Sequence, residues 1–228
     1  MKRMDSILAG SLALALILPT SAAAISVDSV VGTWAPVSGG AGTLTGLGTN
    51  EIRWGNTSSG QDSGYRFDGA APPAFDVGID EAFILGDFTH FNFPIPSGTS
   101  ITQAQLNVDM NYTIDGVSSN NLFEFLFIHD ETPNACSPLP DCSNDSVSIS
   151  GLSTSDVFDI GGILYTLELF GFVQDGAFTD MFSTIEDQAN TAQLVGRFSA
   201  VTVPEPGTLA LAGLGLLGLG VRRRMAKS

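Results

Sequence analysis

The sequence predicts an all-β protein, built as an antiparallel β-sandwich of jelly-roll type. Short segments rich in β-branched and aromatic residues are separated by clusters of Gly, Asn, Ser and Pro, which is typical of sandwiches and barrels. Helical periodicity is scarce, and residues 179–189 offer room for only one or two helical turns. A closed barrel is the alternative arrangement for the same pattern.

The clearest strand covers residues 106–114, where apolar and polar side chains alternate. This alternation is typical of an antiparallel strand with one buried face. Asp115 and Gly116 are expected to begin a polar loop. Residues 122–128 follow, and their nearly unbroken apolar character predicts a strand buried on both faces.

Two later strands, 157–160 and 163–167, flank a Gly-Gly pair. Two adjacent glycines supply the positive φ angles that a two-residue hairpin turn requires. A final strand is expected over 192–200, running directly toward the proline-rich C-terminal end. In the first third of the chain, residues 48–55 predict a turn followed by a short strand.

Three large or charged side chains near the N-terminal end have predictable roles. Trp34 and Trp54 would form a carbohydrate-stacking platform if exposed, or fill the sandwich core if buried. We expect them in the core. Arg53 is expected to pair with a carboxylate, because acidic residues greatly outnumber basic ones in this part of the chain.

Residues 1–24 predict a secretory signal peptide. Lys2 and Arg3 precede an apolar stretch over 7–18, and a run of small residues ends at Ala24. The apolar stretch of about 12 residues is within the signal-peptide range and short for a membrane span. The Sec translocon would therefore export the remaining chain, in which residues 25–203 form one predicted sandwich domain.

Positive charge is concentrated at the two ends of the chain. Of nine Lys and Arg residues, only three arginines lie in 25–203, against 22 acidic residues, which gives a formal charge of −19. Such acidity disfavours binding to nucleic acid and to anionic lipid surfaces. It is compatible with simple solubility, and also with Ca²⁺ bound by carboxylates.

The C-terminal end has three parts in a fixed order. Pro204, Glu205 and Pro206 end the preceding strand, because proline removes backbone donors and restricts its neighbours. An uncharged apolar run over 208–221 follows, and arginines occupy 222–224. As a helix this run would span about 21 Å, short of the roughly 30 Å bilayer core. It predicts a weakly anchored membrane helix held by cytoplasmic charge; a buried C-terminal helix would instead show a polar face.

Together, residues 204–228 resemble the PEP-CTERM sorting signal of exported proteins in Gram-negative bacteria. In that family an exosortase, a membrane-embedded cysteine protease or transpeptidase, handles the tail, and the cargo often accompanies exopolysaccharide loci. The resemblance implies transient anchoring in the inner membrane, facing the periplasm. It then implies transfer to the cell surface or extracellular matrix, with a mature product that ends near Pro204.

The most distinctive segment of the body contains Thr89, His90 and Asn92. Alternation over 89–95 predicts a short strand, and Pro94 indicates an edge strand or a strand end. His90 and Asn92 are expected to hydrogen-bond loop backbone and so to hold a corner of the sandwich.

Only one further histidine, His129, is present, and Asp130 and Glu131 follow it. Together with His90 these residues would form a metal site or an acid–base group, as an alternative to the corner-holding role. We assign neither a metal site nor catalytic residues on the sequence alone.

Several segments of the body resemble the THxN family of PEP-CTERM proteins, which is named after a Thr-His-x-Asn tetrapeptide. The segments are Trp34, the pair at 39–40, residues 48–55, residues 63–67 and the tetrapeptide at 89–92. The resemblance implies an exported, surface-sorted protein. The family has no established activity or catalytic residues that would apply to this chain.

Cys136 and Cys142 predict a disulfide, because an isolated close pair in an exported chain is most simply a crosslink. Closing so small a loop contributes roughly 2 kcal/mol in the chain-entropy model. A metal site would require further Cys or His ligands, and redox activity usually accompanies closer spacing.

The sequence contains no nucleophile triad, phosphate loop or zinc-protease motif. We therefore expect a non-catalytic surface or extracellular-matrix protein without a cofactor, associated with exopolysaccharide or a biofilm. The alternatives are a polysaccharide- or Ca²⁺-binding module and, third, a hydrolase. A hydrolase would require opposed carboxylates or His90 in a cleft.

Overall fold

The computed structural model describes residues 25–40, 42–58, 60–70, 75–134, 143–150, 157–160 and 162–201. These residues form 13 strands and no helix. The strands are β1 (Ile25–Gly39), β2 (Glu51–Trp54), β3 (Ser63–Gly69), β4 (Phe75–Val77), β5 (Ala82–Asn92), β6 (Ile101–Ile114), β7 (Val117–Asp130), β8 (Asp145–Ile149), β9 (Phe158–Ile160), β10 (Ile163–Gln174), β11 (Ala177–Thr179), β12 (Met181–Thr184) and β13 (Gln188–Val201).

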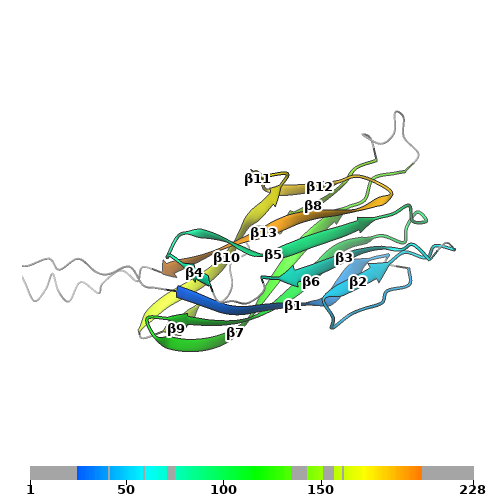
Figure 1. Ribbon diagram of the computed structural model, residues 1–228. Helices are drawn as coiled ribbons and strands as arrows, with labels where there is room; N and C mark the ends of the chain where they lie inside the picture. The colour runs from blue at the N-terminus through cyan, green and yellow to red at the C-terminus, as the bar shows by residue number, and fades with distance from the viewer. Residues whose placement is uncertain are drawn as a thin grey trace, which may run out of the picture.

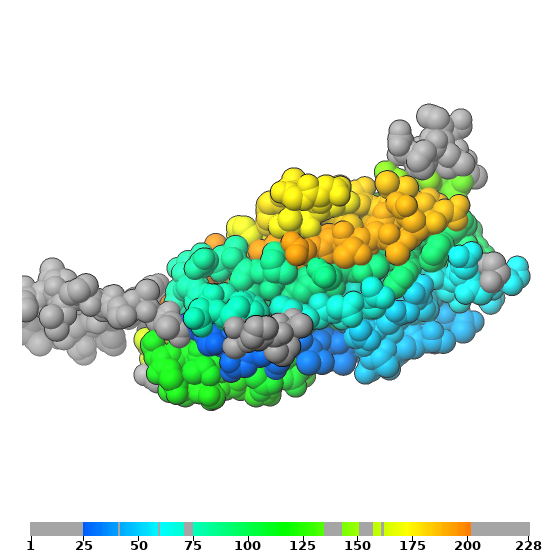
Figure 2. Space-filling model, viewed as in Figure 1, coloured from blue at the N-terminus to red at the C-terminus, as the bar shows by residue number. Residues whose placement is uncertain are grey.

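The strands form two antiparallel sheets that pack against each other (Figure 1). One sheet has the order β12-β8-β7-β6-β1-β4. The other has the order β11-β10-β13-β5-β3-β2, with β9 paired to β10. The prediction of an all-β sandwich is confirmed, and the closed barrel is wrong because the two sheets remain separate. Figure 2 shows the face on which orange β13, teal β5 and cyan β3 lie next to one another.

The two ends of the sandwich differ in what they carry. The start of β1 and the end of β13 lie at the same end, on the left in Figure 1. The arrowhead of β5 lies at the opposite end. The end of β5 therefore lies far from both ends of the described chain.

An aromatic core fills the space between the sheets. Phe88 on β5 lies at its centre, with ring-centroid distances of 5.0 to 6.0 Å to five other rings. These five are Trp34, Tyr65, Phe127, Phe172 and Phe182. Trp34 and Trp54 are 1% and 0% exposed, so their predicted place in the core is confirmed and they form no surface platform.

The hairpin of β6 and β7 confirms one strand prediction and corrects another. β6 buries alternate side chains over 106–114, as expected. β7 begins directly after a two-residue turn, in which Asp115 and Gly116 have φ angles of 48° and 81°, so the expected polar loop is wrong. Leu122 is 57% exposed, because the outer face of this sheet is open to solvent. Only one face of β7 is buried.

Three further expectations are settled by strand pairing. Pro94 correctly marked a strand end, but β5 is no edge strand because it lies between β13 and β3. The predicted Gly-Gly hairpin is confirmed by the pairing of Ile160 with Ile163. The helical turns expected over 179–189 are wrong: β12 and the start of β13 occupy this segment, and alternate side chains of β12 point into the core.

The predicted pairing of Arg53 with a carboxylate is confirmed. Its Nε lies 2.8 Å from Glu51 Oε1, and its guanidinium lies 3.5 Å from the centroid of the Phe91 ring. The short strand expected after residue 48 is β2, which contains both partners of the ion pair.

The predicted signal peptide, the Cys136–Cys142 disulfide and the C-terminal membrane helix lie outside the described residues. Within the part of the chain that is described, no helix is long and apolar enough to cross a membrane.

Replacing Phe88 with Ala is expected to destabilise the fold by about 3 to 5 kcal/mol, because it leaves a cavity among five aromatic rings. Phe178→Ala is the matched control, since Phe178 is 53% exposed, and should cost less than about 1 kcal/mol. Urea denaturation of the exported protein measures both values. Equal losses would contradict the central place of Phe88.

Candidate functional site

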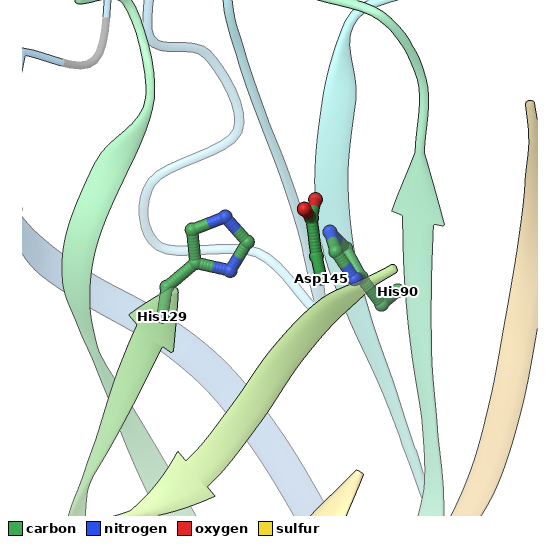
Figure 3. Close-up of side chains that lie close together, drawn as sticks. All are labelled: His90, His129 and Asp145. Carbon is green, nitrogen blue, oxygen red and sulfur yellow. The ribbon is translucent and has the colours of Figure 1, made fainter. Parts of the chain in front are cut away.

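Two histidines from opposite sheets meet inside the sandwich. The two-residue period of a strand places His90 on the inner face of β5 with Phe88, and His129 on the inner face of β7 with Phe127. Their rings are nearly perpendicular, with centroids 5.1 Å apart. Asp145, the first residue of β8, lies beside them (Figure 3).

His90, His129 and Asp145, the buried His–Asp cluster, are 0%, 4% and 0% exposed. One potential metal-ligand atom from each residue lies within 4.8 Å of the others. Trp54 lies against the cluster, with its ring stacked on that of His90 at a centroid distance of 6.1 Å. The cluster is therefore polar and ionisable in aromatic surroundings.

The hydrogen bonds of Thr184 favour one tautomer of His90. His90 Nδ1 lies 2.8 Å from Thr184 Oγ1. This hydroxyl donates its single proton to the carbonyl oxygen of Asp145 at 3.3 Å, and it accepts a bond from Asn92 Nδ2 at 3.3 Å. All three of these bonds form together only when Nδ1 of His90 donates to Thr184. In that tautomer Nε2 carries the lone pair, and it has no hydrogen-bond partner among the described residues.

His129 is held at both ring nitrogens. The Tyr65 hydroxyl lies 2.6 Å from Nδ1, and Glu131 Oε2 lies 3.2 Å from Nε2. Ser100 donates to the same Glu131 oxygen at 3.1 Å. The orientation of the His129 ring is therefore set by one fully buried partner and one partner nearer the surface.

Asp145 is held by only one of its two carboxylate oxygens. Oδ1 accepts bonds from the backbone nitrogen and the hydroxyl of Thr132, at 2.8 and 3.1 Å. Oδ2 is buried and has no hydrogen-bond partner within the described residues. Buried polar atoms normally find partners, so both Asp145 Oδ2 and His90 Nε2 call for an explanation.

Burial changes the protonation behaviour of this region. It raises the pKa of Asp145 to about 6, and the charge of Glu131 adds to the rise. It lowers the pKa of His90 well below the usual range, with His129 acting in the same direction. It also raises the pKa of Glu186 to about 7, and the nearby carboxyls of Asp145 and Glu131 contribute. His90 is thus neutral at physiological pH.

A hollow of about 730 Å³ opens beside the cluster. Its wall includes His129 and Glu131 together with residues 95–98, 100–102 and 130–134. The side chain of Glu131 is 18% exposed, whereas that of His129 is 0% exposed. A molecule in the hollow would therefore meet Glu131 and would not touch the His129 ring.

The grouping of His90 with His129, which the sequence offered only as an alternative, is present, but Asp145 belongs to it and Asp130 does not. Glu131 does contact His129, whereas Asp130 is exposed. Asn92 bonds the backbone carbonyl of Thr184 at 3.3 Å, in line with the corner-holding role, while His90 bonds a side chain.

One member of the cluster, Asp145, and two of its neighbours, Tyr65 and Thr184, were assigned no role from the sequence. Tyr65, Asp145 and Thr184 reach it through strand pairing: Tyr65 is opposite His90, and Thr184 is opposite Asp145. Inward alternation in the segment 63–67 would have identified Tyr65. Thr89, the first residue of the tetrapeptide, bonds Thr191 at 3.0 Å and is not a member of the cluster.

The donor set has a clear chemical preference. Two imidazoles and one carboxylate suit first-row transition metals such as Zn²⁺, whereas Ca²⁺ prefers oxygen ligands alone. Among the described residues, the grouping of potential metal ligands contains both histidines. It therefore gives no support to the Ca²⁺ site that the acidity of the chain made plausible.

Comparison with protein-family models finds the PEP-CTERM protein-sorting motif at residues 202–224. No curated protein matches the chain. The motif indicates an exported protein that is transiently anchored in the membrane, processed by an exosortase and sorted to the cell exterior. It matches the tail and says nothing about the sandwich.

Glu186→Gln should stabilise the protein at pH 8 and have little effect near pH 4.5. The folded-state pKa of Glu186, about 7, lies above the ordinary value of 4.5, so the fold disfavours its ionised form. This cost is present above pH 7 and disappears as the pH falls through 4.5. Thermal melting of the exported protein at both pH values, in the presence of a chelator, measures the effect. Glu124→Gln, at an exposed position on β7, is the control, and an equal gain at both pH values would contradict the raised pKa.

Proposed function

We propose that the mature chain is a non-catalytic protein of the cell surface and extracellular matrix, of the THxN type, associated with the exopolysaccharide of a biofilm. Its delivery follows from the sorting motif at 202–224. Its acidity supports the same destination, because an exported chain of this charge stays soluble and avoids anionic lipid surfaces.

The burial of the His–Asp cluster is the observation that supports a non-catalytic role. A general acid or base must reach the proton that it transfers, directly or through one water. His90 and Asp145 are 0% exposed and His129 is 4% exposed. A polymeric substrate therefore has no direct access to the side chains that are best suited to acid–base chemistry.

A row of hydrogen-bonded polar side chains on the outer face of the six-stranded sheet supports association with polysaccharide. This amide ladder consists of Ser29, Asp109, Asn111 and Asn120. Asn120 Nδ2 donates to Asp109 Oδ1 at 2.6 Å and to Asn111 Oδ1 at 3.0 Å. Asn111 Nδ2 donates to Ser29 Oγ at 2.8 Å. Amides and hydroxyls aligned on a sheet match the donors and acceptors of sugar hydroxyls, which also favours a polysaccharide-binding module as the second candidate.

Replacing Pro204 and Glu205 with Ala is expected to keep a C-terminal epitope in the inner-membrane fraction, because the exosortase would no longer process the tail. Thr208→Ala is the control, since it leaves Pro204, Glu205 and Pro206 in place. Fractionation followed by detection of the epitope measures the outcome. Loss of the epitope at the normal rate in the double variant would contradict processing at this motif.

Asn120→Lys should weaken retention in the matrix roughly fivefold, the equivalent of about 1 kcal/mol of hydrogen bonding. Gln193→Lys places the same charge at an exposed position on β13, in the other sheet, and should retain the normal amount. Quantitative detection in matrix fractions compares the two. Equal retention would rule out the amide ladder as the contact surface.

The non-catalytic assignment has its own test. The purified exported protein is incubated with the host exopolysaccharide, and new reducing ends are measured over time. We expect none above the buffer control. A time-dependent increase that purification does not remove would overturn the assignment.

A further inference from the structure

We propose that the buried His–Asp cluster is a binding site for one divalent transition-metal ion, with Zn²⁺ as the reference ion. His90, His129 and Asp145 each supply one ligand. The site is independent of the proposed role in the matrix, since it depends only on side chains inside the sandwich.

Two of the three ligand atoms are already prepared for an ion. His90 Nδ1 is engaged by Thr184 Oγ1 at 2.8 Å, which leaves the buried Nε2 without a hydrogen-bond partner among the described residues. Thr132 holds Asp145 Oδ1 and leaves the buried Oδ2 without a described partner. Metal ligands are typically oriented in this way, by a hydrogen bond on the atom that does not bind the ion.

His129 supplies the third ligand through Nε2. Its Nδ1 is held by the buried Tyr65 hydroxyl at 2.6 Å, whereas its Nε2 is 3.2 Å from Glu131. The longer contact, to the partially exposed partner, is the one that an ion would replace. Nδ1 would then donate to Tyr65, and the released Glu131 carboxylate would be free to take a fourth position.

The charge distribution supports the same conclusion. The carboxyl of Asp145 is buried and one of its oxygens has no described hydrogen-bond partner, and Glu131 Oε2 lies 3.2 Å from His129 Nε2. The arginines of the described chain form ion pairs elsewhere, with Glu51, Asp68 and Glu168. His129 is the basic side chain beside these carboxyls, and a bound divalent cation would add positive charge where burial makes an ionised carboxyl costly.

The geometry requires only a small contraction. Zn²⁺ binds histidine nitrogen at about 2.0 to 2.1 Å, which places tetrahedral ligand atoms about 3.3 Å apart. One potential ligand atom from each of the three residues lies within 4.8 Å of the others, so side-chain rotations would be needed to close the site. The hollow exposes Glu131, the carboxylate in contact with His129, to solvent.

The test uses the protein purified after export and stripped with a chelator. We expect one equivalent of Zn²⁺ to bind by calorimetry and mass spectrometry, with a higher melting temperature, and Co²⁺ to give visible d–d absorption bands. Ca²⁺ in millimolar excess should not compete. Failure of the wild-type protein to bind one equivalent of Zn²⁺ or Co²⁺ would overturn the proposal.

A matched pair of variants locates the ion. Asp145→Asn preserves the side-chain shape and should weaken Zn²⁺ binding by more than about tenfold. Asp130→Asn makes the same chemical change at the exposed neighbour of His129 and should bind as the wild type does. Near-ultraviolet circular dichroism verifies the fold, and His129→Gln replaces Asp145→Asn if that variant unfolds. Equal affinity in the folded site variant and in Asp130→Asn would refute the assignment.

Discussion

Two hydrogen bonds cross the interior of the sandwich, and the arrangement of its distal end depends on them. Tyr65 on the seven-stranded sheet bonds His129 on the six-stranded sheet at 2.6 Å. His90, also on the seven-stranded sheet, bonds Thr184 on the six-stranded sheet at 2.8 Å. Polar groups in an aromatic core must find partners, because an unsatisfied buried group costs about 1 to 3 kcal/mol. These two bonds set the positions of both imidazoles, and Asp145 joins them through its pairing with Thr184.

The sorting motif and the buried His–Asp cluster are associated with opposite ends of the sandwich. The start of β1 and the end of β13 lie at one end (Figure 1), where the chain continues toward the segments predicted for export and matched by the sorting motif. The buried His–Asp cluster lies near the end of β5, at the other end. The sorting motif therefore follows β13 in the sequence at one end of the sandwich, and the buried cluster lies toward the other end.

Strands were predicted correctly where the pattern of neighbouring residues is sufficient to define them. Alternation over 106–114 identified β6 because its inward-facing side chains are apolar and its outward-facing side chains are polar. The same approach failed for β7: the apolar residues on its outer face, such as Leu122 at 57% exposure, cannot be distinguished in sequence from buried ones. Asp-Gly is a common sequence for a two-residue hairpin turn. The polar residues that follow Gly116 suggested a longer loop, although they belong to β7. β12 was mistaken for helix because it is short and flanked by turn residues.

The sequence alone determined where this protein is sent, because signals for export are contiguous stretches that the translocon and the exosortase recognise in linear form; the match at 202–224 bears this out for the tail. It also determined the fold class, but it did not place the two histidines on the inward-facing side of their strands. Only the tertiary structure decided that these histidines meet, and that Asp145 rather than Asp130 accompanies them. That choice depends on which strands become neighbours and in which register, and no local pattern along the chain encodes such pairing.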